Sequence, residues 1–455
     1  MQIKDRLKKE PDIFLKLAES SLVVAKSLRS NYLDITVKLA ERIRDFLLTG
    51  QTSLVISQVD EPLLNRSLTV CFVDGGIGEA DIFFRVPFIV RGGIFRVKES
   101  ERDIERRETF EFFPVLVGNL EGGEKSRSDY TSVVRIIVEL AAVKHILDDE
   151  KYQDVDMIIL HGPLLYRLSA YTDHWFYEAD MEHMAVDAEA LIDGYKEFCR
   201  SDPEPRSWFN VWSKEKKIRA VYMIAYLLKS IIDQCIYKKI HVIGAVEKAS
   251  ATELCRYLFS ELLNKGLLRE TPFWDYFDLD TGAQHSWNAD RIIDKGNYND
   301  PLLFALVLEP GEYLNFWEAQ ERYSGFSEVG EIKGFGNWLR SLVPISYTYL
   351  KPAENSFALR IEFPTYMTQE KQASEILGKV CQYSRLLPTY VFPLGLDIVD
   401  KFARVPKWMV DAYRKYILFN FGRLPEDEHL DHTELERLLL FYYFHQRAFL
   451  TRPKP

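Results

Sequence analysis

Residues 69–78 read Thr-Val-Cys-Phe-Val-Asp-Gly-Gly-Ile-Gly, and this stretch decides the fold prediction. An apolar run with strong β propensity ends at Asp74. The two glycines that follow predict a tight turn where a substrate backbone can approach closely. A buried strand that presents one carboxylate at its end is a common way to build a metal-dependent nuclease site. A structural aspartate that caps a turn is an equally good interpretation.

The rest of the chain predicts a mixed sheet with flanking helices. Hydrophobic periodicity predicts helices within 12–48, 129–149, 250–265 and 407–450, and a mostly helical region over 175–235. Strands are predicted at 82–90, 94–97, 110–117, 155–160, 241–247, 302–308 and 357–363, with Arg91-Gly92-Gly93 as a hairpin turn. Strands in a run, followed by strand–helix alternation, indicate an α/β fold with a ribonuclease H-like mixed sheet core and flanking and inserted helices.

This order divides the chain into three predicted regions. Residues 1–68 form an N-terminal helical region, and residues 406–455 form a C-terminal one. Residues 69–405 form the core, with a helical insertion near 170–235.

Composition narrows the class of protein. The 455 residues are 47% hydrophobic and 28% charged, which is typical of a globular protein. The net charge of −10 argues against a broadly basic protein that coats DNA, but allows basic residues along one channel. The five scattered cysteines indicate reduced thiols and a cytoplasmic location. We expect no membrane partner, since no apolar stretch approaches the roughly 20 residues that span a bilayer.

A second acidic residue lies on an apolar helix face. Glu139 follows Ile136 by three residues and precedes Val143 by four, so all three share one face of the predicted helix 129–149. A carboxylate in an apolar stripe is costly unless it is paired or binds a metal ion. The alternative is a glutamate at the edge of the stripe that reaches solvent.

Five short segments, in this order and spacing, resemble the NurA nuclease family across roughly 70–405. The specificity comes from their order, because each is short. The segments are Phe72-Val73-Asp74-Gly75-Gly76, Val138-Glu139-Leu140, residues 157–164 (Met-Ile-Ile-Leu-His-Gly-Pro-Leu), residues 242–250 (Val-Ile-Gly-Ala-Val-Glu-Lys-Ala-Ser) and residues 393–403 (Pro-Leu-Gly-Leu-Asp-Ile-Val-Asp-Lys-Phe-Ala).

The resemblance implies a ribonuclease H-like core, a homodimer, divalent manganese or magnesium, and hydrolysis of DNA. It also implies a partner, the hexameric HerA-type translocating ATPase, which feeds DNA into the nuclease. Such pairs act in DNA-end repair or in defence against phage. The chain itself has no phosphate-binding loop motif, so we expect it not to hydrolyse ATP.

The resemblance also assigns roles to three residues. Asp74 and Glu139 match the family's first two acids, and hard cations require such carboxylate oxygens. Lys248 matches the family's lysine, which would neutralise the scissile phosphate. Lys248 as an ordinary exposed residue after a strand is the alternative.

Two positions depart from the family pattern. The family has Asp-Gly after its second buried strand, where this chain has His161-Gly162, and it has a histidine where this chain has Asp400. Either the acid and the imidazole have exchanged positions within one site, or the site has decayed and the protein is a pseudonuclease. Asp397 is a rival to Asp400. Exchange would favour manganese, because imidazole is a poor ligand for magnesium.

The predicted catalytic set is therefore Asp74, Glu139, His161, Lys248 and Asp400, with the first three as metal ligands. The leading hypothesis is a metal-dependent DNA nuclease subunit that works with a HerA-like ATPase. The competing hypothesis is a catalytically impaired, NurA-like interaction subunit that caps and regulates the ATPase. A third is an unrelated α/β protein.

Overall fold

The structure is a computed structural model that describes residues 11–59, 67–79, 88–99, 109–117, 124–178, 187–201, 217–247, 249–269, 271–280, 282–326, 333–386 and 392–421. Its strands are β1 (Ile56–Gln58), β2 (Thr69–Glu79), β3 (Phe88–Lys98), β4 (Thr109–Val117), β5 (Met157–His161), β6 (Trp175–Tyr177), β7 (Lys217–Arg219), β8 (His241–Val246), β9 (Glu312–Leu314), β10 (Trp317–Glu318), β11 (Ile345–Leu350) and β12 (Leu359–Pro364).

The helices of the described residues cover both faces of the main sheet. They are α2 (Pro11–Asn31), η1 (Tyr32–Val37), α3 (Lys38–Leu48), α4 (Glu124–Asp148), η3 (Glu150–Tyr152), η4 (Leu168–Tyr171), α6 (Ala188–Ser201), α8 (Ala220–Lys238), α9 (Glu253–Asn264), α10 (Thr271–Phe277), α11 (His285–Gly296), α12 (Asp300–Val307), α13 (Gln320–Tyr323), α14 (Phe335–Leu342), η6 (Thr365–Met367), α15 (Glu370–Arg385), α16 (Leu394–Ala403) and α17 (Lys407–Phe421).

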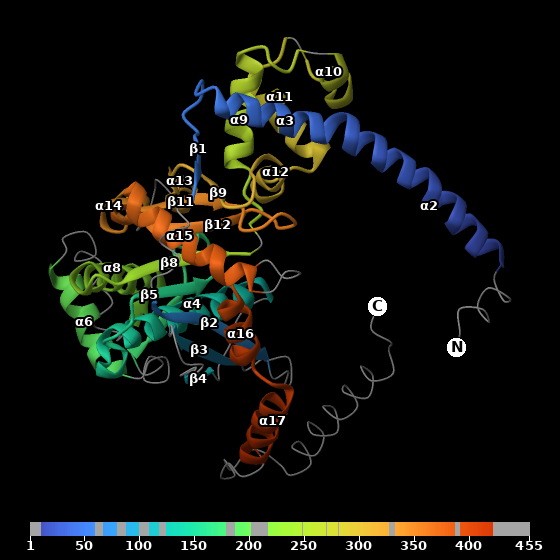
Figure 1. Cartoon of the computed structure of the whole chain (residues 1–455). Helices are drawn as coiled ribbons and strands as arrows, with labels where there is room; N and C mark the ends of the chain where they lie inside the picture. Colours follow the sequence, from blue (N-terminus) through green and yellow to red (C-terminus); the bar gives the residue numbers. More distant parts are fainter. Residues whose placement is uncertain are drawn as a thin grey trace.

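The main sheet is mixed. Its strands follow the order β1-β9-β11-β12-β8-β5-β2-β3-β4, and β10 pairs with β11. The strands β2, β3 and β4 are antiparallel, whereas β5 is parallel to both β2 and β8. The predicted α/β class, with a ribonuclease H-like mixed sheet core and flanking helices, is confirmed (Figure 1).

The parallel pairing of β2 with β5 aligns two predicted site residues. The register matches Val70 with Met157 and ends with Val73 opposite Leu160. Asp74 and His161 are therefore the next residues on two neighbouring strands. Both β5 and β8 end at this edge of the sheet, which is where parallel strands of α/β proteins commonly form a site.

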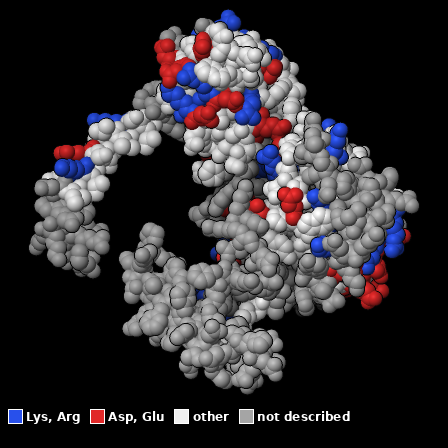
Figure 2. Space-filling view, turned by 180° about the vertical axis from the view of Figure 1, so that it is seen from behind, with Lys and Arg blue, Asp and Glu red and all other residues white. Residues whose placement is uncertain are grey.

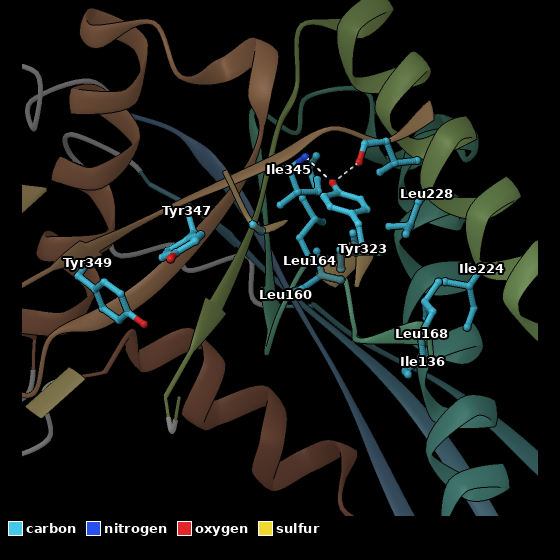
Figure 3. Close-up of a cluster of buried hydrophobic side chains, with 14 of the residues drawn as sticks. Ile136, Leu160, Leu164, Leu168, Ile224, Leu228, Tyr323, Ile345, Tyr347 and Tyr349 are labelled. Atoms are coloured by element: carbon cyan, nitrogen blue, oxygen red, sulfur yellow. Dashed lines mark hydrogen bonds between the residues drawn. The ribbon is translucent and has the colours of Figure 1, made fainter. Parts of the chain in front are cut away.

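The two faces of the sheet are covered by different helices. Along β2, Cys71 and Val73 pack into a core with α4 and α8, whereas Val70 and Phe72 pack into a second core with α15 and α16. This alternation follows from the two-residue period of a strand. Figure 3 shows side chains of the first core, among them Ile136 of α4, Ile224 of α8 and Leu160 of β5.

A buried tyrosine joins this core to the strands on the other side of β8. The hydroxyl of Tyr323 donates to the carbonyl of Val343 at 2.6 Å and accepts from the amide of Ile345 at 2.8 Å. Both hydrogen bonds appear in Figure 3. The hydroxyl is thus satisfied inside the core, as a buried polar group must be.

The glycines after Asp74 and between the predicted strands 82–90 and 94–97 do not make turns. β2 continues through Gly75 and Gly76 to Glu79, and β3 continues through Gly92 and Gly93, so the predicted tight turn and hairpin are wrong. Residues 82–87 lie outside the described part. The glycines serve packing instead, since a Cβ on Gly92 would lie 2.8 Å from Val138 of α4.

The predicted strand at 302–308 is also wrong, because residues 302–307 belong to α12. The side chain of Asn299 caps its first turn by accepting from the amide of Leu302, and Pro301 occupies an early position. Proline in the first turn of a helix costs no hydrogen bond. A short apolar run does not distinguish a buried helix from a strand by periodicity.

Two helices have unusual surfaces. By length and composition alone, α8 could cross a membrane, which the sequence did not predict; however, 61% of that stretch is buried inside the protein. The N-terminal helix α2 stands away from the body in Figures 1 and 2.

The division of the chain into regions 1–68, 69–405 and 406–455 stays a prediction.

Candidate metal centre

Three of the predicted residues meet at one edge of the sheet. Asp74 lies on β2, His161 ends β5, and Asp400 lies on the last turn of α16. Their ligand atoms, one from each side chain, all lie within 4.8 Å of one another. The strands and the helix are far apart in the chain, so only tertiary packing brings the three together.

The contact between Asp74 and His161 is direct. Nδ1 of His161 and Oδ2 of Asp74 are 3.0 Å apart, and the amide of Gly75 donates to Oδ1 of Asp74 at 2.8 Å. The ring of His161 also lies against Phe392, with 5.3 Å between ring centroids. Burial lowers the pKa of His161, but the hydrogen bond and the nearby carboxylates outweigh it, so the pKa is raised above 6.5.

Asp400 reaches the site because α16 packs closely on β2. A Cβ on Gly76 would lie 2.2 Å from the carbonyl oxygen of Ala403, so only glycine allows this approach. Nη2 of Arg404 pairs with Oδ2 of Asp400 at 2.6 Å. The rival Asp397 pairs with Lys401 at 2.5 Å and is not part of the group. Asp400 therefore lies near Asp74 and His161, whereas Asp397 does not join this group.

Glu139 approaches from the opposite face of the sheet. It is 3% exposed, and its Oε2 accepts from the hydroxyl of Tyr166 at 3.0 Å. Nη1 of Arg135 lies 3.6 Å from Oε1. Burial raises the pKa of Glu139 to about 7, and the negative charge of Asp74 adds to that rise.

The glycine at position 75 makes room for this carboxylate. A Cβ there would lie 2.6 Å from Oε1 of Glu139. That oxygen is buried and has no hydrogen-bond partner among the described residues. A buried acceptor without a partner is costly, and a bound cation would satisfy it.

The donor set fits a divalent cation. The carboxylates of Asp74 and Asp400 and the imidazole of His161 lie together, and a third carboxylate, Glu139, approaches β2 from the opposite face of the sheet. Carboxylate oxygens suit magnesium and manganese, and the imidazole favours manganese between the two. Sequence reasoning named Glu139 as a ligand, yet the ligand atoms that cluster are those of Asp74, His161 and Asp400.

Lys248 lies outside the described residues. Sequence reasoning missed Arg135 and Tyr166, which hold Glu139, and Phe392, which packs on His161. The position of Arg135, four residues before Glu139 on a helix, was the available signal for that ion pair. Tyr166 and Phe392 carry no comparable signal, because loops place them there.

A polar pocket begins next to the centre. It has a volume of about 950 Å³, and Pro163 lines it, two residues after His161. Arg322 and Arg360 face it from α13 and β12, beside Glu253 and Glu321. Behind them, the fully buried Glu362 accepts from Nη2 of Arg322 at 3.0 Å and from Nε of Arg360 at 2.9 Å.

Comparisons with known proteins find one matching family model and several similar solved structures. The family model described as NurA domain matches residues 68–405, more than half of the chain. The chain is similar to the NurA nuclease from Sulfolobus solfataricus, with 14% identity and a TM-score of 0.48, over 91% of this chain and 98% of that one. None of the curated proteins matches.

Two further solved structures are similar. A NurA crystal structure with manganese has 10% identity and a TM-score of 0.36, over 87% of this chain and 99% of that one. A NurA crystal structure bound to dAMP and manganese has 12% identity and a TM-score of 0.33, over 89% and 94% of the two chains.

Proposed function

Because the chain belongs to the NurA domain family, we propose that it is a metal-dependent DNA nuclease. The observation that carries the proposal is the group of Asp74, His161 and Asp400, whose ligand atoms lie within 4.8 Å of one another at the edge of the sheet. Manganese is the proposed ion, because the donor set includes an imidazole and two of the similar solved structures contain manganese.

The chain's own residues would hold and orient the ion. Asp74, His161 and Asp400 supply the ligand atoms, and Glu139 supplies a buried carboxylate beside them. Tyr166 and Arg135 fix the orientation of Glu139, in the way that outer partners commonly fix metal ligands. When bound, a divalent cation lowers the pKa of water and stabilises charge on a phosphate.

A second candidate function follows from His161. This residue stands where the resemblance predicts an aspartate, and an imidazole is a poorer ligand for magnesium than a carboxylate. A catalytically impaired subunit that caps and regulates a HerA-like ATPase would carry such a change. Activity with manganese distinguishes the two candidates.

We also propose a homodimer, a HerA-like hexameric ATPase as partner and a cytoplasmic location. The exposed apolar residues of α2 support an assembly, because large unpartnered apolar surfaces mark interaction sites. The ATPase rests on the family alone. All five cysteines are buried, as suits a reducing compartment. A role in DNA-end processing or phage defence is proposed without a choice between them.

The test compares Asp74→Asn with Asp397→Asn. Both remove one carboxylate charge at constant volume, but Asp397 pairs with Lys401 outside the group. With manganese and a DNA substrate, we expect Asp74→Asn to lower cleavage at least ~100-fold, since a metal supplies several kcal/mol to the transition state. Asp397→Asn should stay within a few-fold of the parent.

The control measurements are manganese binding by calorimetry and thermal unfolding. Asp74→Asn should lose manganese affinity while it unfolds cooperatively. A parent protein that binds manganese but cleaves no DNA would favour the impaired subunit. Full cleavage by Asp74→Asn would exclude the centre as the nuclease site.

A further inference from the structure

A stretch of the chain beside the metal centre combines basic and aromatic residues. Residues 401–416 read Lys-Phe-Ala-Arg-Val-Pro-Lys-Trp-Met-Val-Asp-Ala-Tyr-Arg-Lys-Tyr. Five of the sixteen are lysine or arginine, and one, Asp411, is acidic. Because Lys401 and Arg404 pair with Asp397 and Asp400, the excess of positive charge comes from Lys407, Arg414 and Lys415 against Asp411, in contrast with the net charge of −10 for the whole chain. Such a patch attracts the phosphates of a nucleic acid.

Aromatic side chains on this stretch face solvent. Trp408 is 68% exposed, Tyr416 is 68% exposed and Phe402 is 50% exposed. Along α17, Lys407 and Trp408 are exposed, and so are Lys415 and Tyr416 eight residues later. Trp408 and Lys415 are seven residues apart, which is close to two full turns, so these two side chains lie on one side of the helix. A tryptophan is a large ring that a folded protein usually buries.

Packing on β2 fixes this surface next to the centre. A Cβ on Gly78 would lie 2.6 Å from Val405 and 2.8 Å from Val410, so the start of α17 rests directly on the strand that carries Asp74. Phe402 follows Asp400 by two residues, and Arg404 is bonded to Asp400. Figure 1 shows α16 and α17 in succession at this end of the sheet.

We propose that residues 401–416 bind single-stranded nucleic acid and lead it to the metal centre. Trp408 provides the main face on which a base stacks, and Lys407 and Lys415 contact the backbone phosphates. Stacking on a protein ring requires an unpaired base, whereas phosphate contacts alone serve a duplex equally well. This inference rests on the proposed function and specifies its substrate as a strand with unpaired bases.

Charge disfavours a second copy of this chain as the occupant. A two-fold contact places the same patch on both partners. Lys407, Arg414 and Lys415 would then meet the same basic residues of the second copy, and like charges repel across such an interface.

The experiment measures binding in EDTA, where no metal-dependent cleavage occurs. The probes are a fluorescein-labelled oligothymidylate and a blunt duplex of the same length, followed by anisotropy. Base–aromatic stacking is worth about 1–3 kcal/mol per base, so Trp408→Ala should weaken oligothymidylate binding by ~10-fold. Trp408→Phe should recover most of the affinity, and duplex binding should change less than ~2-fold.

Trp287→Ala is the matched control. Trp287 is 46% exposed and lies on α11, at the far end of the molecule from α17 in Figure 1. Trp287→Ala should leave the affinities for the oligothymidylate and for the duplex unchanged. Equal losses for strand and duplex, or no loss for Trp408→Ala, would overturn the proposal, as would conversion of a dimer into a monomer by Trp408→Ala.

The outcome is separable from that of the proposed function. Because binding is measured without metal, a protein that cleaves no DNA in manganese still passes this test if Trp408 selects single strands. Conversely, if the protein cleaves DNA but Trp408→Ala leaves its affinity for single strands unchanged, the proposed function stands and this inference is wrong.

Discussion

At the scale of single residues, the glycines of β2 decide how the centre forms. A strand interior normally carries side chains, and glycine weakens it. Gly75 leaves space for Glu139 of α4, and Gly76 leaves space for the end of α16. Successive positions on a strand lie on opposite faces of the sheet. Gly75 therefore leaves space for Glu139 on one face, and Gly76 leaves space for the helix turn that carries Asp400 on the other.

Gly76→Ala tests this role. The new methyl group would meet the carbonyl oxygen of Ala403 at 2.2 Å, and a backbone atom can move only with its helix. We expect a loss of about 1–3 kcal/mol in the free energy of unfolding, typical of overpacking, with weaker manganese binding because Asp400 shifts with α16. Urea denaturation and calorimetry measure the two effects.

Gly282→Ala is the control, since its methyl group would meet only Asp280, at an ordinary 3.5 Å. Wild-type stability and manganese affinity for Gly76→Ala would show that α16 does not depend on this approach.

At the scale of elements, α9, α13, β12 and the loop after His161 together line the polar pocket. Arg360, 1% exposed, stacks 3.8 Å from the ring centroid of Tyr347 and pairs with Glu321 and Glu362. The amide of Leu165 donates to Glu362 at 3.3 Å, which ties the loop to this network. Breaking a buried ion network leaves an uncompensated charge, so each member depends on the others.

Stability should depend on pH through Glu253 in this network. Burial and the nearby carboxylate of Glu321 raise the pKa of Glu253 to about 7, from an ordinary 4.5. The proton resides on Glu253, because the guanidinium of Arg360 favours the charged form of Glu321. A raised pKa means that the folded state prefers the protonated acid. Its contribution is complete below about pH 4.5 and is lost as pH rises through about 7.

Glu253→Gln mimics the protonated acid and cannot titrate. The melting temperature of the parent, minus that of this variant, should therefore fall between pH 4.5 and 7.5 in calorimetric scans. A difference in melting temperature that stays constant across this pH range would contradict the raised pKa of Glu253.

At the scale of the whole molecule, α2 is a surface without a partner in the described chain. Ile13, Leu15, Leu17, Leu22 and Leu28 are each more than half exposed. In Figure 2 the helix stands off the body, and most of its described surface is neither basic nor acidic. A helix that is hydrophobic over most of its circumference is normally buried.

The double variant Leu15→Lys with Leu22→Lys tests whether α2 joins two copies. We expect a dimer for the parent and a monomer for the variant in light scattering after size exclusion, because two lysines cannot be buried unpaired at low cost. Lys26→Gln, on the same helix, is the control and should remain a dimer. A monomeric parent, or a dimeric double variant, would remove α2 from the proposed assembly.

The sequence by itself determined the features that depend on local pattern. The order of strands and helices around Asp74, the buried helix face of Glu139, and the strand before His161 all follow from side-chain periodicity over a few residues. The same local reasoning placed strand 357–363 close to its observed bounds at Leu359–Pro364.

Only the tertiary structure decided which residues meet. Asp400 rather than Asp397 joins Asp74 and His161, because Gly76 lets the last turn of α16 reach the strand. Glycines that are typical of turns became packing sites for helices, and the apolar run 302–308 became a helix through its cap. The approach of Ala403 to Gly76 joins segments hundreds of residues apart, and local propensity carries no information about such a contact, whereas the capping of α12 by Asn299 is a local signal.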